Sequence, residues 1–345
     1  MRASRSALAL LMAAACFSSS VAWSGERIEV PLEQRVLSDG NIRYFVTISL
    51  GGSRRIAAMV DTGSTGLRIL SRAIPDSAFA SISEQPSVYG YGSGVRLTGV
   101  VANIRLGLGQ LSSPQPVPVQ LVRKIDCFPK QPHCPASRIS EADYRIGGDG
   151  LPRQGFDAIF GIGMATGPVD KPLRLLGAKT WIVVLPRPGE RRPGALILNP
   201  AGDETAGYTF FPTQARVKNL NGGAPAHDAI PGCLVVAKTG KRICGPTLLD
   251  TGAPGVSIAS AKAAERSGWK PGERMAILFR NRQGGVVNAE FRAGAGKPSQ
   301  IHASTPKNEK QTDAQIAAGT LPYFLFSALY DDERQLVGLK RRQGP

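Results

Sequence analysis

The sequence predicts an all-β protein built from two similar halves. Gly and Pro are plentiful, with 40 and 26 copies in 345 residues, and long amphipathic helical patterns are scarce. Short alternating runs bounded by turn residues favour many short strands. The motif Asp-Thr-Gly occurs twice, at positions 61–63 and 250–252, each time after an apolar run. Because roughly half of the chain separates the copies, we expect each half to contribute one carboxylate to a shared site.

The first 22 residues have the pattern of a secretory signal peptide. A positively charged start precedes an apolar run at 7–15 that is too short to cross a bilayer. Small residues at 20–22 then offer a cleavage site. We therefore expect an exported protein, periplasmic or secreted. The alternative is a lipoprotein that is modified at Cys16.

Strand patterns follow in order along the mature chain. Alternating runs at 27–32 and 44–50 precede a third at 55–60, which ends at Asp61. We place the boundary between the halves near residue 180, so residues 23–180 carry Asp61 and residues 181–345 carry Asp250. Later apolar or strand-like runs lie at 156–163, 181–185, 194–198, 233–244, 323–329 and 336–339, and a short helix is expected at 259–267.

Glycines surround two tyrosines, Tyr89 and Tyr91, in the segment 87–99. A strand pattern resumes directly afterwards. The residues alone leave two interpretations open: a mobile β-hairpin with an aromatic tip, or an ordinary glycine-rich surface turn.

The cysteines predict two disulfides. The chain has five, and cleavage of the signal leaves those at 127, 134, 233 and 244. Among three possible connectivities we prefer the local pairs Cys127–Cys134 and Cys233–Cys244, because 233–244 has the pattern of a hairpin that turns near 238–240. A zinc site is the weaker alternative, since neither pair has C-x₂-C spacing and the three histidines form no ligand cluster. We expect no metal and no cofactor.

The chain is strongly basic, with a formal net charge of +16. Such a surface attracts polyanions. The basic clusters at 54–55, 191–192 and 340–342 are scattered, however, and none alternates with aromatic residues as binding of single-stranded nucleic acid requires. We interpret the charge as a solvated surface, with at most a weak association with an anionic envelope and no nucleic-acid partner.

Two carboxylates held a few ångströms apart cannot both be comfortably ionised, so they share one proton. One of Asp61 and Asp250 can then act as a base while the other acts as an acid. A water held between them is polarised for attack on an amide carbonyl, and no covalent intermediate is needed. A single Asp-Thr-Gly is usually a simple turn. Two copies at strand ends favour the paired site.

The residues that follow each aspartate fit this chemistry. Thr62 and Thr251 can hydrogen-bond to the opposite loop and lock the pair. Gly63 and Gly252 let backbone N–H groups approach the carboxylates closely. Ser64 can donate a hydrogen bond to the first carboxylate. We therefore expect these five residues to support the pair.

The chain resembles the pepsin-like aspartic proteases over most of its mature length. This resemblance implies a two-lobed β fold with a deep central cleft and a β-hairpin flap, under which an extended peptide binds. It also favours Tyr91 over Tyr89 as the flap tyrosine, with Gly92 beside it. The matching segments are residues 61–67 and 250–253 for the active-site motifs, 91–94 with 97–99 for the flap, 159–161 for the strand behind the first loop, and 330–339 for the C-terminal strand pair.

Three positions depart from the family pattern. Arg68 stands where pepsins usually have a tryptophan that supports the flap tyrosine. Ala253 replaces the usual Ser or Thr, although retroviral aspartic proteases also carry Asp-Thr-Gly-Ala. The C-terminal counterpart of the segment 159–161, near Ala318-Gly319, is degenerate.

The sequence thus predicts a monomeric aspartic endopeptidase, of a bacterial periplasmic type, that cleaves a peptide or protein substrate with Asp61 and Asp250. The alternative is a non-catalytic pepsin-like binding or inhibitor module, for which Arg68 and Ala253 are the motivation. Such modules usually lose a catalytic aspartate, whereas this chain keeps both. A polyanion-binding envelope protein is the third interpretation.

Overall fold

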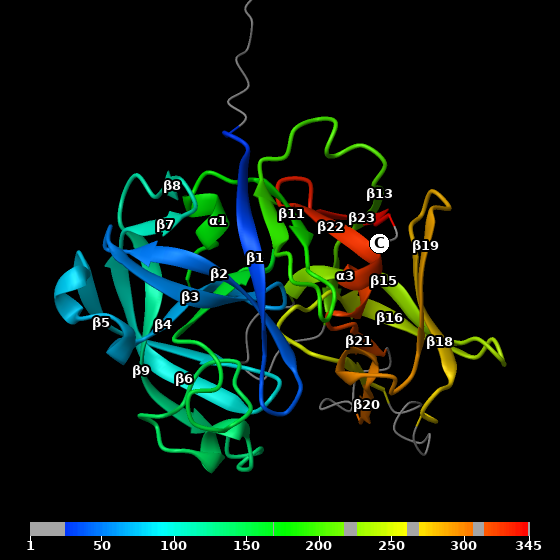
Figure 1. Cartoon of the computed structure of the whole chain (residues 1–345), viewed down its shortest axis with the longest axis horizontal. Helices are drawn as coiled ribbons and strands as arrows, with labels where there is room; N and C mark the ends of the chain where they lie inside the picture. The colour runs from blue at the N-terminus through cyan, green and yellow to red at the C-terminus, as the bar shows by residue number, and fades with distance from the viewer. Residues whose placement is uncertain (1–24, 168, 217–225, 261–268, 306–313, 344–345) are drawn as a thin grey trace, which may run out of the picture.

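The computed structural model describes residues 25–167, 169–216, 226–260, 269–305 and 314–343. The expected signal peptide, with Cys16, lies outside these residues, as does most of the helix expected at 259–267. The described residues are mostly β and form two mixed sheets, which confirms the predicted class (Figure 1). Among them, no helix has the length and apolar character needed to cross a bilayer.

The larger sheet has fifteen strands in the order β13-β23-β22-β11-β12-β1-β2-β3-β10-β4-β9-β6-β5, with β7 on β2 and β8 on β7. It includes strands from both sides of residue 180, so strand pairing does not test the expected lobe boundary there. The strands are β1 (Ile28–Val36), β2 (Ile42–Leu50), β3 (Arg54–Asp61), β4 (Thr65–Leu70), β5 (Ser81–Gly90), β6 (Val95–Ile104), β7 (Leu106–Leu108), β8 (Leu111–Ser112), β9 (Val117–Cys127), β10 (Ala158–Ile162), β11 (Thr180–Val184), β12 (Gly194–Leu198), β13 (Thr209–Pro212), β22 (Phe326–Asp331) and β23 (Leu336–Arg341).

The second sheet has eight strands in the order β19-β18-β15-β16-β21-β17-β20, with β14 on β15. In Figure 1, β15, β16, β18 and β19 lie on the opposite side of the view from β2 to β9. Its strands are β14 (Gln214–Arg216), β15 (Ala226–Val236), β16 (Arg242–Leu248), β17 (Val256–Ala259), β18 (Arg274–Arg280), β19 (Val286–Arg292), β20 (Ile301–Ser304) and β21 (Gln315–Ala317). The helical segments are short: α1 (Pro172–Leu175), α3 (Leu321–Leu325), η1 (Ser71–Ala73), η2 (Asp76–Ala78), η3 (Pro135–Arg138) and η4 (Lys297–Ser299).

The two sheets contain the same four-strand arrangement. In the first, β10 runs parallel to β3 and antiparallel to β4, and β4 runs parallel to β9. In the second, β21 runs parallel to β16 and antiparallel to β17, and β17 runs parallel to β20. Asp61 ends β3, and Asp250 follows β16 by two residues. The duplicated motif therefore lies at equivalent places in two repeated units.

Glycines let a strand or turn pass directly behind each aspartate loop. A Cβ atom on Gly161, in the fully buried β10, would lie 2.8 Å from the Gly66 carbonyl oxygen. A Cβ atom on Gly319, just after β21, would lie 2.4 Å from the Gly255 carbonyl oxygen, and its φ of 61° also favours glycine. The segment 315–319, which seemed degenerate in sequence, thus makes the same close approach as 159–161.

Both predicted disulfides are present. Cys127, at the end of β9, bonds to Cys134, and Cys233 bonds to Cys244 directly opposite it in the β15–β16 hairpin. That hairpin turns at 237–241, as expected from sequence. Since disulfides persist in oxidising compartments, the pairing supports export of the chain, although the location stays a prediction.

Candidate active site

Two threonine hydroxyls hold the Asp-Thr-Gly loops together. The Thr62 amide donates to Thr251 Oγ1 and the Thr251 amide donates to Thr62 Oγ1, both at 3.0 Å. Each hydroxyl donates in turn to a carbonyl of the other loop: Thr62 to Leu249 O and Thr251 to Val60 O, both at 2.8 Å. Both threonines are at most 1% exposed. The cross-loop hydrogen bonds that the sequence predicted are therefore present, and water does not compete with them.

Two buried tyrosines add to this interlock on one side. Tyr323 OH lies 3.0 Å from Thr62 Oγ1, whose single proton is already donated to a carbonyl, so Tyr323 is the donor. Tyr330 OH then donates to Tyr323 OH. Burial raises the pKa of both phenols, so both stay neutral donors. The sequence analysis missed this chain of hydroxyls, because only folding brings α3 and β22 behind the first loop.

Each aspartate is held by its own loop. Asp61 accepts hydrogen bonds from the Gly63 amide at 2.8 Å and from Ser64 Oγ at 2.5 Å. Asp250 accepts one from the Gly252 amide at 2.9 Å. These are the contacts expected from the sequence, and they fix the orientation of both carboxylates before anything binds.

The two carboxylates converge across the interlocked loops. A Cβ atom on Gly63 would lie 2.5 Å from Asp250 Cγ. A Cβ atom on Gly252 would lie 2.6 Å from Asp61 Oδ1 and 3.1 Å from Asp250 Oδ1. Any side chain at either position would collide with the carboxylate of the opposite loop. Only glycine permits this approach.

The carboxylates line a cleft of about 570 Å³. Seven of the predicted site residues line it, whereas Thr62 and Thr251 lie behind it. The predicted residues in the wall are Asp61, Gly63, Ser64, Tyr91, Gly92, Asp250 and Gly252.

The hairpin β5–β6 covers one side of the cleft. Its turn is closed by hydrogen bonds from the Tyr91 amide to Val95 O and from the Gly94 amide to Tyr91 O, both 2.9 Å. Tyr89 and Tyr91 both line the cleft, with ring centroids 5.1 Å apart. The Tyr91 hydroxyl is buried and has no partner among the described residues. Because this atom has almost no exposed surface, a molecule in the cleft could reach it only after the hairpin moves.

Arg68 supports this hairpin from below. Its side chain is fully buried on β4, and it donates to the carbonyls of Thr65 and Gly66. The guanidinium carbon lies 3.4 Å from the centroid of Tyr89 and 6.0 Å from that of Tyr91. A cation–π contact thus links β4 to the hairpin. Arg68, which departs from the expected tryptophan, therefore supports the hairpin and does not line the cleft.

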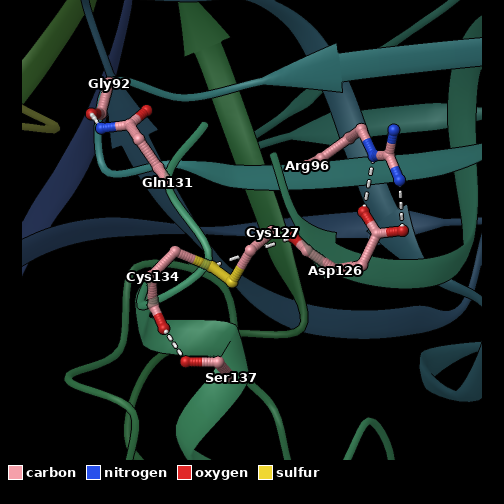
Figure 2. The surroundings of a disulfide bond; sticks show 7 residues. All are labelled: Gly92, Arg96, Asp126, Cys127, Gln131, Cys134 and Ser137. Carbon is pink, nitrogen blue, oxygen red and sulfur yellow. Dashed lines mark hydrogen bonds and ion pairs between the residues drawn. A yellow bond between two sulfur atoms is a disulfide. The ribbon is translucent and has the colours of Figure 1, made fainter. Parts of the chain in front are cut away.

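The Cys127–Cys134 disulfide closes a loop that packs against the hairpin turn (Figure 2). The Phe128 amide donates to Gly94 O at 2.9 Å, and a Cβ atom on Gly94 would lie 2.8 Å from Gln131 Cβ and 3.1 Å from Cys134 Cβ. The adjacent ion pair between Arg96 and Asp126, visible in Figure 2 and 2.6 Å long, lowers the pKa of Asp126. The disulfide loop therefore restrains the turn.

Arg43 is a further cleft residue that the sequence analysis missed. It lies on β2 and is only 9% exposed. Its guanidinium donates to Gly147 O at 2.8 Å and to Gly252 O at 2.9 Å, so it ties the first sheet to the second aspartate loop. The only sequence signal was a charge directly before the alternating run at 44–50.

The chain matches no protein-family model, and no curated protein is significantly similar to it. Within the described ranges, no three His, Cys, Asp or Glu side chains are grouped to hold a metal ion.

Replacing either threonine by valine should destabilise the protein by about 2–4 kcal/mol, because an amide and a carbonyl in the interlock lose their partners. We expect Thr62→Val to cost more than Thr251→Val, since it also removes the acceptor of Tyr323. Urea unfolding measures both changes. Thr62→Ser and Thr251→Ser, which keep the hydroxyl, are the controls. Serine variants as unstable as the valine variants would contradict this account.

Removing the Cys127–Cys134 disulfide, by Cys127→Ser with Cys134→Ser, should loosen the hairpin turn. We expect amide hydrogen exchange at residues 91–95 and 128–134 to accelerate at least about tenfold, because the loop can then open locally. The matched control is Cys233→Ser with Cys244→Ser, which should leave this segment unchanged. Equal exchange at 91–95 in both double variants would refute the restraining role.

Proposed function

We propose that the chain is an aspartic endopeptidase with a two-lobed, pepsin-like fold. One observation carries the proposal: two repeated strand arrangements each contain an Asp-Thr-Gly loop, between β3 and β4 and between β16 and β17, and the interlocked loops present two carboxylates to one cleft. A single such loop has many structural explanations. A matched pair whose glycines admit the opposite carboxylate is the arrangement that acid–base activation of a water requires.

In this proposal the pair holds one proton between Asp61 and Asp250. The ionised carboxylate takes a proton from a water held between them, and that water attacks the peptide carbonyl carbon. The protonated carboxylate donates to the carbonyl oxygen. The carboxylate that took the water proton then gives a proton to the leaving nitrogen, and the C–N bond breaks as the other carboxylate takes back a proton from the tetrahedral intermediate. Because the attacking group is water, no acyl-enzyme forms.

The cleft supports an extended peptide as the substrate. The hairpin β5–β6 would close over it as a flap, which excludes bulk solvent from the reacting bond while the attacking water stays between the carboxylates. Movement of the hairpin would bring the unpartnered, buried Tyr91 hydroxyl to the bound peptide as a hydrogen-bond donor, and Gly92 at the turn keeps the approach free of side chains. The flap role of these two residues is part of the proposal.

The non-catalytic alternative loses much of its motivation. Arg68 packs beneath the tyrosines and is absent from the cleft wall, and Ala253 lines the cleft without covering either carboxylate. Neither departure blocks a substrate. We therefore favour catalysis over a binding or inhibitor module.

The variants Asp61→Asn and Asp250→Asn test the proposal. Each should lower peptide cleavage by at least about a thousandfold, because the amide can neither accept the water proton nor donate as a carboxylic acid. A statine-type inhibitor should block the unaltered protein. Cleavage is measured on a peptide library by mass spectrometry between about pH 3 and 7, the range in which such a pair can hold one proton.

The control is Asp203→Asn, in an exposed turn, which should keep full activity. Thermal unfolding would confirm that all three variants fold. The proposal fails if the unaltered protein cleaves nothing in the library, or if either active-site variant keeps its activity.

A further inference from the structure

The charges in the cleft wall are unevenly balanced. Two fixed positive charges, on Arg43 and Lys297, face a pair of carboxylates that bears one negative charge when it holds one proton. The imidazole of His302 also lines the cleft. No other charged side chain lines the cleft among the described residues. The wall therefore carries a surplus of positive charge.

Arg43 does not use all of its hydrogen-bond donors within the described residues. Its Nε and Nη1 atoms donate to two carbonyls, which carry no formal charge, and Nη2 has no acceptor among the described residues. It makes no ion pair within them either, although Asp39, Asp61 and Asp250 lie close enough to act on its charge. A guanidinium so deeply buried without a direct carboxylate partner is costly. A carboxylate that enters the cleft would supply one.

Lys297 lies beside the same aspartate loop. It begins η4, and its backbone carbonyl would lie 3.1 Å from a Cβ atom on Gly255, which follows the second Asp-Thr-Gly. Its Cε atom lies 3.8 Å from the Cβ position on Gly40, in the turn that leads to Arg43. Lys297 is half-buried, and its ammonium group makes no ion pair or hydrogen bond within the described residues. Both cations thus flank the Asp250 loop.

The rest of the wall is different in character. Beneath the hairpin the lining is apolar and aromatic, with the side chains of Met59, Tyr89, Val95, Leu97, Tyr144, Ile146 and Ile159. The cleft therefore combines this apolar and aromatic lining with the two cations.

We propose that Arg43 and Lys297 form a subsite for a side-chain carboxylate, so that the protein prefers peptides with Asp or Glu near the scissile bond. This rests on the proposed endopeptidase function and adds its substrate class. The carboxylate would accept charge-assisted hydrogen bonds from Arg43 Nη2 and the Lys297 ammonium group. Complementary charge of this kind sets specificity.

Matched peptides test the subsite. The two peptides of a pair differ at a single position, which holds Glu in one peptide and Gln in the other. Different pairs place this position before or after an apolar cleavage site. Both peptide ends are blocked so that a terminal carboxylate cannot contribute. At pH 6 we expect the best Glu peptide to be cleaved about tenfold faster than its Gln partner. At pH 3, where Glu is mostly protonated, the ratio should fall towards one. The titration of the aspartate pair cancels in this ratio.

A charge reversal identifies the residue responsible. Lys297→Glu should abolish the preference for Glu and favour a Lys peptide at the same position. Lys241→Glu, an equal charge change in an exposed hairpin turn, is the control and should keep the preference. Arg43→Gln is less suitable, because it also removes the bond to the Gly252 carbonyl.

The outcomes separate the two proposals. Equal cleavage of Glu and Gln peptides at pH 6, or a preference that Lys297→Glu leaves intact, would overturn the subsite and leave proteolysis standing. Absence of all cleavage would overturn the endopeptidase. In that case, the affinities of Glu and Gln peptides with a statine at the scissile position, measured by fluorescence anisotropy, still decide the subsite.

Discussion

The exchange of hydrogen bonds between Thr62 and Thr251 is the contact on which the site depends. It joins loops that lie roughly half of the chain apart, and each hydroxyl satisfies one amide and one carbonyl of the interlock. Because the interlock is buried, losing one partner would leave unsatisfied polar groups out of reach of water. The loops are therefore held in one relative position. In this position the carboxylate of each loop lies directly against the glycine of the other loop. The two carboxylates are thereby brought close enough for a paired acid–base site.

The backbone of the site is nearly symmetric, whereas its side chains are not. Ser64 donates to Asp61, but Ala253, at the equivalent position of the second loop, has no hydroxyl to donate. Tyr323 and Tyr330 extend the interlock behind Thr62. Arg43 binds the second loop through Gly252. Two carboxylates of the same chemical type thus have different surroundings, which is how paired acids are given different roles.

The hairpin over the cleft is supported from two directions. Arg68 stacks beneath Tyr89, and the disulfide loop restrains the turn at Gly94. The guanidinium carbon of Arg68 lies 3.4 Å from the centroid of the Tyr89 ring, so a cation–π contact supports the hairpin here. Arg68 therefore supports the hairpin at the position where the resemblance noted in the sequence leads one to expect tryptophan. The support leaves the Tyr91 hydroxyl unpartnered at the cleft.

The sequence by itself predicted the mostly-β class from its short alternating runs, and it favoured the local disulfide pairs that the structure has. It also predicted the local contacts of Ser64, Gly63 and Gly252, because neighbouring residues in a short motif fix their geometry. It also indicated which two loops should meet. Only the tertiary structure decided what surrounds them. The segment 315–319 pairs with its neighbouring strand as 159–161 does, although the two sequences differ. This is possible because backbone hydrogen bonds between strands do not depend on particular side chains. The contacts of Arg43, Lys297 and Tyr323 join residues from separate elements, so no local pattern could reveal them.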